Sequence, residues 1–430
     1  MVLATKGEVS SKAKAPTRSN TERIAFPLLY LLAFIAIVSV IVRIYLRHDS
    51  FGIWDFPFIF DFANEFIKTG VLYSQDPSLY KPSVPVGYPH PPLSPSLLVF
   101  VIKLGFSREV IFNFLSFAHA ACFLGAVFCC WLGAFARHSL AFLFAVFFVV
   151  AMMVPTMENN LMLLLLEPCL LLIVCLSLAC LSRGRDFLAG SCIGFGAMLK
   201  IYPGVFLCYF LLTRRWKSVW GAVCASFVCL LFSIFVMGVK ENVTYFLVAL
   251  PQQLKELPYL FFYENTSLPS YALYFDLLSP ESAKRAGTII FLSLLFLSLY
   301  PSSVRPLVTK KKNMVAAIDY AVIVALLVLC MPNSWWNYQI HLLVPAVVVA
   351  IFLAKQDRVE WGLLSLFTYS IISLSITVVM SIDNDIQYFI DMDSSVRMMY
   401  IVLRGLPNVI LFGLPFFIRW QIFLGKQYNY

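Results

Sequence analysis

Two aspartates in the stretch IWDFPFIFDF have the side chains that acid–base chemistry needs. Asp55 and Asp61 lie six residues apart among aromatic residues, shortly after a long apolar segment. A positioned carboxylate can remove the proton of a hydroxyl group while that oxygen attacks another atom. The stretch therefore supplies two candidates for a general base.

A lysine within an apolar run is the most informative single residue. Lys200 interrupts GSCIGFGAMLKIYPGVFLCYFLL, where a charge at membrane depth is costly unless it meets water or an anion. It could bind a phosphate, or its ammonium could reach the membrane interface. Arg43 and Arg404 also lie in apolar segments and could assist it.

Two further polar stretches adjoin apolar runs. MENNLMLLLLEPC carries Glu158 and Asn160, whose side chains could bind a sugar hydroxyl, and an asparagine here could instead cap a helix that starts near Leu161. MPNSWWNYQIHLLVPA could form an interfacial aromatic belt or a platform on which a sugar stacks. Its candidate side chains are Trp335, Asn337, Tyr338 and His341.

Two Asp-x-Asp patterns, at 383–385 and 391–393, offer the hard oxygen ligands that divalent metals prefer. A short solvated loop rich in Asp and Ser explains them without a metal, so we expect neither a metal nor a cofactor. Asn242 and Asn265 each begin a tripeptide that fits a glycosylation sequon.

Membrane helices must position these residues. The chain has 430 residues, 60% of them hydrophobic and 13% charged, which is typical of polytopic membrane proteins. Several apolar runs approach or exceed the roughly 20 residues that cross a hydrocarbon core. The clearest are 25–46, 109–133, 160–181, 218–238, 286–300, 315–331, 359–380 and 398–419.

The basic residues favour a membrane-lipid environment over a nucleic-acid partner. The net charge is +9, but the cations lie in tails and short loops, as the positive-inside rule predicts, and form no basic face. We expect residues 1–24 to be a disordered cytoplasmic tail. Residues 25–430 are expected to form one transmembrane domain.

An inside N-terminus places two large loops on the outer side, 47–90 and 239–284. Helical spacing of apolar residues over 55–69 predicts a short helix in the membrane interface. The long outer loop therefore carries the two aspartates on a helix.

The middle of the chain permits two threadings. In the first, 92–104 and 187–212 are each one full span. In the second, 92–104 only dips into the membrane, and 187–212 breaks at 200–203 into two short arms. The second places the basic residues of the middle region inside, and Pro203 favours the break. It sends these side chains to one outer face: Asp55, Tyr88, His90, Glu158, Asn159, Asn160, Lys200, Tyr202, Asn265, Trp335, Asn337, Tyr338 and His341.

Four segments resemble glycosyltransferase family 87 in order and spacing: DFPFIFDFANEFIKTGVLY, YPHPPLSPSLLVF, GSCIGFGAMLKIYPGVFLCYFLLTRRW and MPNSWWNYQIHLLVPA. In that family an Asp after the first span precedes a Gly and a Tyr, as Asp55 precedes Gly70 and Tyr73 here. A Lys-x-Tyr-Pro element of the family matches Lys200 and Tyr202. The resemblance implies an all-α polytopic membrane protein with the GT-C fold, about 11 or 12 transmembrane helices and outer loops carrying interfacial helices.

The resemblance also implies a polyprenyl-phosphate sugar, such as the mannose derivative, as co-substrate, and a glycolipid or glycan acceptor on the extracytoplasmic side. It supports Asp55 as the base, with Asp61 in reserve, and Lys200 as a ligand of the donor phosphate. We hypothesise an inverting displacement in which His341 bridges to the phosphate or shuttles a proton. Tyr202, Arg43 and Arg404 are further phosphate-binding candidates. The sugar- or acceptor-binding candidates are Tyr88, His90, Glu158, Asn160, Asn265, Trp335, Asn337 and Tyr338.

Two other classes of membrane protein fit the same composition. A transporter or flippase of a lipid-linked sugar could use an intramembrane lysine and broken helices, but it predicts symmetric halves, and the loops 47–90 and 239–284 have no inward counterparts. A non-catalytic subunit of a glycosylation complex would tolerate the loss of Asp55 and Lys200. Sugar-transfer assays of these variants therefore separate a subunit from an enzyme.

Overall fold

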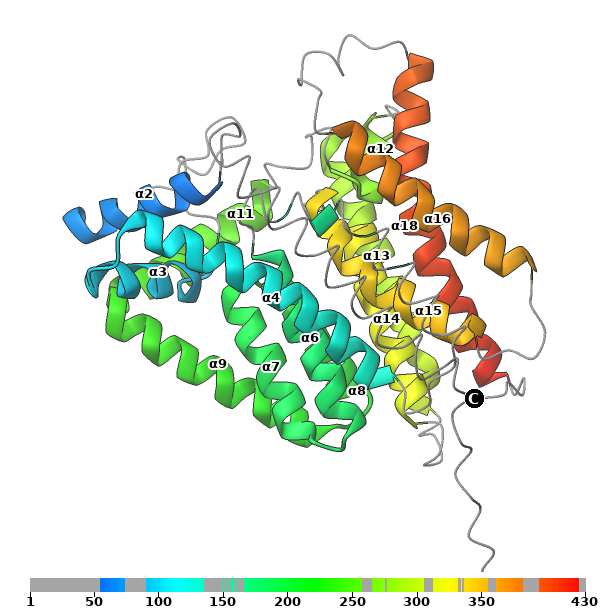
Figure 1. The fold of residues 1–430 in the computed structure, drawn as a ribbon, viewed down its shortest axis with the longest axis horizontal. Helices are drawn as coiled ribbons and strands as arrows, with labels where there is room; N and C mark the ends of the chain where they lie inside the picture. Colours follow the sequence, from blue (N-terminus) through cyan, green and yellow to red (C-terminus); the bar gives the residue numbers. More distant parts are fainter. Residues whose placement is uncertain are drawn as a thin grey trace, which may run out of the picture.

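The computed structural model shows a protein built from helices that pack as two groups (Figure 1). It describes residues 55–73, 90–134, 149, 153, 156–157, 160, 166–256, 265–274, 277–304, 312–331, 334, 336–354, 361–381 and 394–424. Within these ranges, four helices are long and apolar enough to cross a membrane, at 108–130, 216–237, 280–304 and 405–423. The chain is thus an all-α polytopic membrane protein, and the total of 11 or 12 spans stays a prediction.

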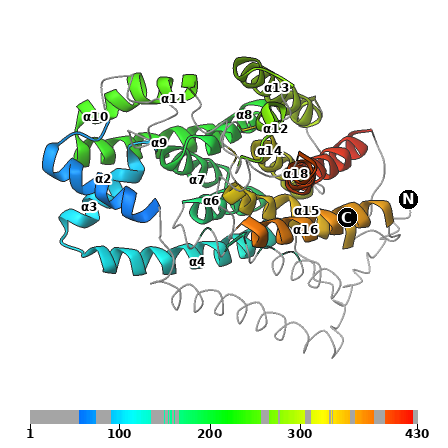
Figure 2. The same cartoon turned by 90° about the horizontal axis from the view of Figure 1, so that it is seen from above.

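The first group is a layer of four helices. They are α4 (Arg108–Ala134), α6 (Glu167–Ser182), α7 (Asp186–Leu199) and α9 (Trp216–Met237), and in Figure 2 they lie in the order α9, α7, α6, α4. The sulfur atoms of Cys122 and Cys169 are 3.6 Å apart, and Gly125 packs on Leu172. The same separation of 47 residues in both contacts shows that α4 and α6 run in the same direction.

Glycines bring α7 and α9 into backbone contact. A Cβ atom on Gly190 would lie 1.7 Å from the carbonyl oxygen of Ser218, and one on Gly194 would lie 2.2 Å from that of Ala222. Only residues without a Cβ allow membrane helices to approach this closely. Both contacts join residues 28 apart in sequence, so α7 and α9 also run in the same direction.

The segment after α7 turns back on itself. Lys200 is extended (φ −155°, ψ 135°) and ends α7. A 3-10 turn, η2 (Tyr202–Val205), contains Pro203 and leads into α8 (Phe206–Leu212). Proline cannot donate a helical hydrogen bond, so the helix stops here. The predicted break is confirmed, and a single long span over this segment is wrong.

The second group contains the remaining long helices. Its elements are α12 (Leu268–Tyr274), α13 (Pro280–Val304), α14 (Lys312–Cys330), η4 (Trp336–Leu342), α15 (Leu343–Ala354), α16 (Trp361–Ser381) and α18 (Ser394–Phe423). Residues 314–330 of α14 are all buried, because this helix packs against α13, α15 and α18 of its own group and against α6 of the first. It is therefore the central element that joins the two groups.

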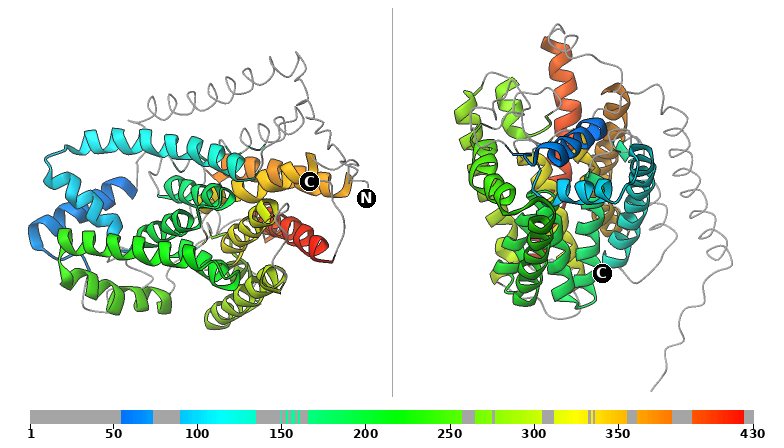
Figure 3. Two further views of the ribbon diagram at one scale, coloured as in Figure 1. Left: turned by 90° about the horizontal axis from the view of Figure 1, so that it is seen from below. Right: turned by 90° about the vertical axis from the view of Figure 1, so that its left-hand side faces the viewer.

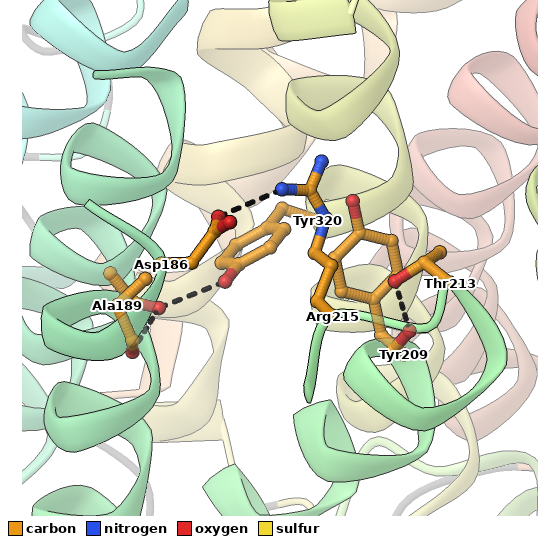
Figure 4. Close-up of polar contacts among 7 residues, drawn as sticks. Asp186, Ala189, Tyr209, Thr213, Arg215 and Tyr320 are labelled. Atoms are coloured by element: carbon orange, nitrogen blue, oxygen red, sulfur yellow. Dashed lines mark hydrogen bonds and ion pairs between the residues drawn. The ribbon is translucent and has the colours of Figure 1, made fainter. Parts of the chain in front are cut away.

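Polar contacts hold both ends of the α7–α8 hairpin at one end of the molecule (Figure 4). Arg215 Nη1 donates to Asp186 Oδ1 at 2.9 Å. Nearby, the hydroxyl oxygens of Ser177 and Tyr320 lie 2.8 Å apart, and Ser177 donates to the carbonyl oxygen of Ala189 at 2.8 Å. The basic residues that the second threading places on one side of the membrane also lie at this end of the molecule. They are Arg183, Arg185, Arg214, Arg215 and Lys217.

Short helices gather at the opposite end of the layer. They are α2 (Asp55–Thr69), α3 (Leu93–Lys103), α10 (Val239–Thr244), the π-helical turn η3 (Tyr245–Ala249) and α11 (Leu250–Glu256); α2 and α3 face the viewer on the right of Figure 3. The helix predicted over 55–69 is confirmed. Its buried face consists of Phe56, Phe60, Ala63 and Phe66.

The helix α3 is too short to cross a membrane. Its 11 residues extend about 16 Å at 1.5 Å per residue, against a hydrocarbon core of about 30 Å. Ser96 Oγ lies 3.0 Å from Ser233 Oγ, near the carboxyl end of α9. The segment 92–104 therefore stays at this end, as the second threading predicts.

A buried glutamate attaches the residues after α2 to α10. The backbone N–H groups of Leu72 and Tyr73 donate to Glu241 Oε2 at 2.8 and 2.9 Å. The Tyr73 hydroxyl donates to the carbonyl oxygen of His90 at 2.7 Å. The chain enters this contact through Gly70, whose φ of 72° suits glycine. The Gly and Tyr positions matched in the family pattern thus fix residues 70–73, directly after α2.

Candidate functional site

The site is organised by a buried ion pair between α6 and the end of α7. Lys200 Nζ lies 2.5 Å from Glu167 Oε1, and the side chains are 17% and 0% exposed. Glu167 is the first residue of α6 and Pro168 follows it, so its carboxylate lies at the helix end that favours negative charge. Lys200 is free to point toward it because α7 ends at this residue.

Aromatic side chains surround the ammonium group. Lys200 Nζ lies 4.5 Å from the ring centroid of Tyr338, within the range of a cation–π contact. The Tyr202 hydroxyl lies 2.6 Å from His341 Nε2, and the rings of Tyr202 and Tyr338 are 5.8 Å apart. The turn η2 therefore supplies Tyr202, and η4 supplies both Tyr338 and His341.

His90 also lies in the field of the ion pair. Burial and the positive charge of Lys200 lower the pKa of His90 to about 3, and the negative charge of Glu167 opposes this shift. His90 is therefore neutral at physiological pH. We define the Lys200 site as Glu167, Lys200, Tyr202, Tyr338 and His341, with His90 beside it.

The Lys200 site lies about halfway along the long helices. The spacing of the α4–α6 contacts places Glu167 level with residue 120 of α4, about 18 Å from the start of that helix. The α7–α9 contacts place Leu199 level with residue 227 of α9, about 15 Å before its end. The predicted gathering of Lys200, Tyr202, Tyr338 and His341 is confirmed. Their place on the outer face of the membrane stays a prediction, and α2, α3 and α10 extend the molecule beyond them.

This arrangement suits an anion that approaches from the exposed part of Lys200. The ammonium group has three N–H donors, and Glu167 engages one of them. The neighbouring phenol and imidazole can donate or accept a proton through their shared hydrogen bond. Among the residues described, no group of three or more His, Cys, Asp or Glu side chains could hold a metal ion. The Asp-x-Asp patterns at 383–385 and 391–393 lie outside them.

Three predicted site residues lie elsewhere in the fold. Asp61 is exposed on α2, on the side away from the buried phenylalanines. Asn160 is fully buried, and its amide donates to the carbonyl oxygen of Thr156 at 2.9 Å. The alternative that this asparagine caps a helix starting near Leu161 is wrong, because α6 begins at Glu167.

Asn265 belongs to a separate polar cluster. It is 1% exposed, and its side-chain oxygen accepts from the backbone N–H of Ser267 at 3.0 Å. The adjacent Thr266 donates to the carbonyl oxygen of Ser334 at 2.7 Å, which attaches this cluster to the segment before η4. Asn242, the other sequon asparagine, is 3% exposed, so both sequon asparagines are buried in the folded protein.

The remaining predicted side chains cannot be placed. Arg43, Tyr88, Glu158 and Trp335 lie outside the described residues, as do the side chains of Asp55, Asn337 and Arg404. Asp55 is the first residue of α2, and only its backbone is described.

Glu167 is a site residue that sequence reasoning missed. The signal was present in the stretch LLLLEPCLLLIVCL, where a carboxylate stands inside an apolar run. A charge in such a run needs a partner, and Lys200 is the cation in the neighbouring apolar run. Pairing the two by this rule would have found the contact.

The comparisons with known proteins agree with the resemblance in the sequence. The family model described as glycosyltransferase family 87 matches residues 88–332, more than half of the chain. This range contains α6, which begins with Glu167, and also α7 and η2, which lie on either side of Lys200. A search of curated proteins finds no match.

Proposed function

Because the chain belongs to glycosyltransferase family 87, we propose that it moves mannose from a polyprenyl-phosphate donor to a glycolipid or polysaccharide on the outer side of the membrane. The family match carries the reaction class. The buried Lys200 at mid-depth of α9 supports the donor class, since a lipid-linked phosphate is an anion that can approach from among membrane helices.

The proposed reaction is one displacement at the anomeric carbon of the sugar. The acceptor oxygen forms a bond to that carbon as the bond from the carbon to the phosphate oxygen breaks. The acceptor proton passes to Asp55, and the phosphate leaves with an added negative charge. Attack opposite the leaving group inverts the anomeric configuration.

The Lys200 site provides the groups for the leaving phosphate. A charged Lys200 stabilises the developing negative charge best in a site that excludes water. Tyr202 and His341 act as a hydrogen-bonded pair that contacts the phosphate, and Tyr338 stacks on the sugar. Arg43 and Arg404 stay proposed helpers, and Asp61 stays the reserve base.

Transfer from polyprenyl-phosphate mannose carrying radiolabelled mannose tests this function in membranes that contain the protein. We expect Asp55→Asn to lose about a hundredfold or more in rate, the usual contribution of a general base. Lys200→Ala should lose about a hundredfold, as when one group that stabilises charge in the transition state is removed. Asp61→Asn separates the two candidate bases: it should retain activity if Asp55 is the base and lose activity if Asp61 is.

Three results would change the proposal. Full activity of Asp55→Asn at wild-type expression would overturn the assignment of the base. Transfer from a different polyprenyl-phosphate sugar only would overturn mannose. Absence of transfer from every such donor would favour a non-catalytic subunit.

A further inference from the structure

Glu167 carries a charge where isolated charges are costly. Its side chain is fully buried. One oxygen contacts Lys200 at 2.5 Å, and the other, Oε2, has no hydrogen-bond partner among the described residues. A buried carboxylate with an unpaired oxygen costs stability, so its presence here points to a use for its charge.

Glu167 is the only carboxylate among the described titratable side chains that face Lys200. The others are Tyr202 from η2, Tyr338 and His341 from η4, and His90 from the segment before α3. A buried amine without a negative neighbour loses its proton easily. Among the described side chains, Glu167 therefore supplies the negative charge that keeps Lys200 protonated while no other anion is bound.

We propose that Glu167 is a positioning residue that keeps Lys200 protonated and directed into the site until the donor phosphate arrives. Glu167 is buried beneath Lys200 and acts through it. Once bound, the phosphate supplies a negative charge of its own. The role in donor binding rests on the proposed function, whereas the effect on Lys200 does not.

The first experiment measures the charge of Lys200 without any donor. Acetic anhydride acetylates neutral amines, so its rate of reaction with Lys200 across a pH series, followed by mass spectrometry of the purified protein, reports the loss of the proton. Lys240 is exposed on α10 and serves as the internal reference. We expect Glu167→Gln to shift labelling of Lys200 to lower pH by at least about one unit.

Two variants act as controls for this shift. Glu167→Asp retains a carboxylate and should label more like the wild type than Glu167→Gln does. Glu109→Gln changes an exposed glutamate in the first turn of α4 and should leave labelling of Lys200 unchanged. If Glu167→Gln does not fold, Glu167→Asp takes its place. A small shift of Lys200 labelling to lower pH then supports the inference, and labelling identical to the wild type overturns it.

The second experiment measures transfer from polyprenyl-phosphate mannose. In Glu167→Gln, KM for the donor should rise with pH by up to about tenfold per unit once Lys200 loses its proton, while the wild-type KM stays level. The value of kcat at saturating donor should change little, because the bound phosphate restores the proton. Adding Lys200→Arg to Glu167→Gln should abolish the pH dependence, since guanidinium stays protonated.

The outcomes separate this inference from the proposed function. Identical labelling of Lys200 in wild type and Glu167→Gln overturns the inference, even if transfer occurs. A labelling shift without transfer by the wild type supports the role of Glu167 and counts against the donor. A fall in kcat that is equal at all pH values would indicate a merely structural role for Glu167.

Discussion

At the scale of single residues, buried charge explains the Lys200 site. Lys200 ends α7 at mid-depth of the helical layer, and Glu167 neutralises it from the first turn of α6. The resulting pair is neutral overall, and the nearby His90 is also neutral because its pKa is lowered to about 3. Among the described side chains, the charges of Glu167 and Lys200 therefore balance each other until an anion binds.

His90 makes stability depend on pH in a predictable direction. An unfolded histidine has a pKa of about 6.5, so below this value the unfolded chain binds a proton that the folded chain does not. The free energy of unfolding should therefore fall as pH falls from about 6.5 toward about 3. Between pH 7 and pH 5 the wild type should lose about 1–2 kcal/mol that His90→Gln does not lose.

Thermal unfolding of the two proteins in detergent at several pH values measures this difference. Above pH 7 the change in melting temperature between them should be independent of pH. Parallel curves down to pH 5 would show that the folded His90 can bind a proton, contrary to the prediction.

At the scale of elements, the α7–α9 contact sets the position of Lys200. Gly190 and Gly194 allow the two backbones to touch, and Lys200 follows directly at the end of α7. Gly194→Ala should lower the free energy of unfolding by about 1–3 kcal/mol, because the added methyl group forces the helices apart. The melting temperature in detergent checks this.

Gly413→Ala is the matched control. A Cβ at Gly413 in α18 meets no atom within 4 Å, so this substitution should be neutral or slightly stabilising. Equal melting temperatures for the two variants would mean that α7 and α9 are not in backbone contact.

Local rules predicted the elements better than the contacts. The spacing of apolar residues predicts the helix 55–69, and Pro203 with the nearby basic residues predicts the break after Lys200, because each signal lies within a short stretch. The Glu167–Lys200 contact joins residues 33 apart in sequence and depends on how α6 and α7 pack. The helix start expected near Leu161 is wrong because Asn160 is itself helical, and its amide donates to the carbonyl oxygen of Thr156 four residues earlier.

At the scale of the whole molecule, a second buried ion pair joins three helices near the carboxyl terminus. Arg419 Nε on α18 donates to Asp319 Oδ1 on α14 at 2.8 Å, and the side chains are 2% and 1% exposed. Ser302 on α13 donates to Asp319 Oδ2 at 2.5 Å and accepts from Arg419 Nη2 at 2.6 Å. Asp319 lies beside Tyr320, whose ring packs at 4.6 Å from that of Phe206 in α8. The pair therefore orients the central helix on which the α7–α8 hairpin rests.

Arg419→Met should destabilise the protein strongly, by about 3–5 kcal/mol, because it leaves the charge of Asp319 buried without a cation. Combining it with Asp319→Leu should recover most of the loss, since an apolar pair of similar volume can replace a buried ion pair. The exposed pair of Arg285 and Glu281, at 3.4 Å, provides the control, and Arg285→Met should have little effect. Melting temperatures and the yield of monodisperse protein measure the three variants against the wild type. If the double variant is no more stable than Arg419→Met, the cost lies in lost packing around α18 rather than in an unpaired charge.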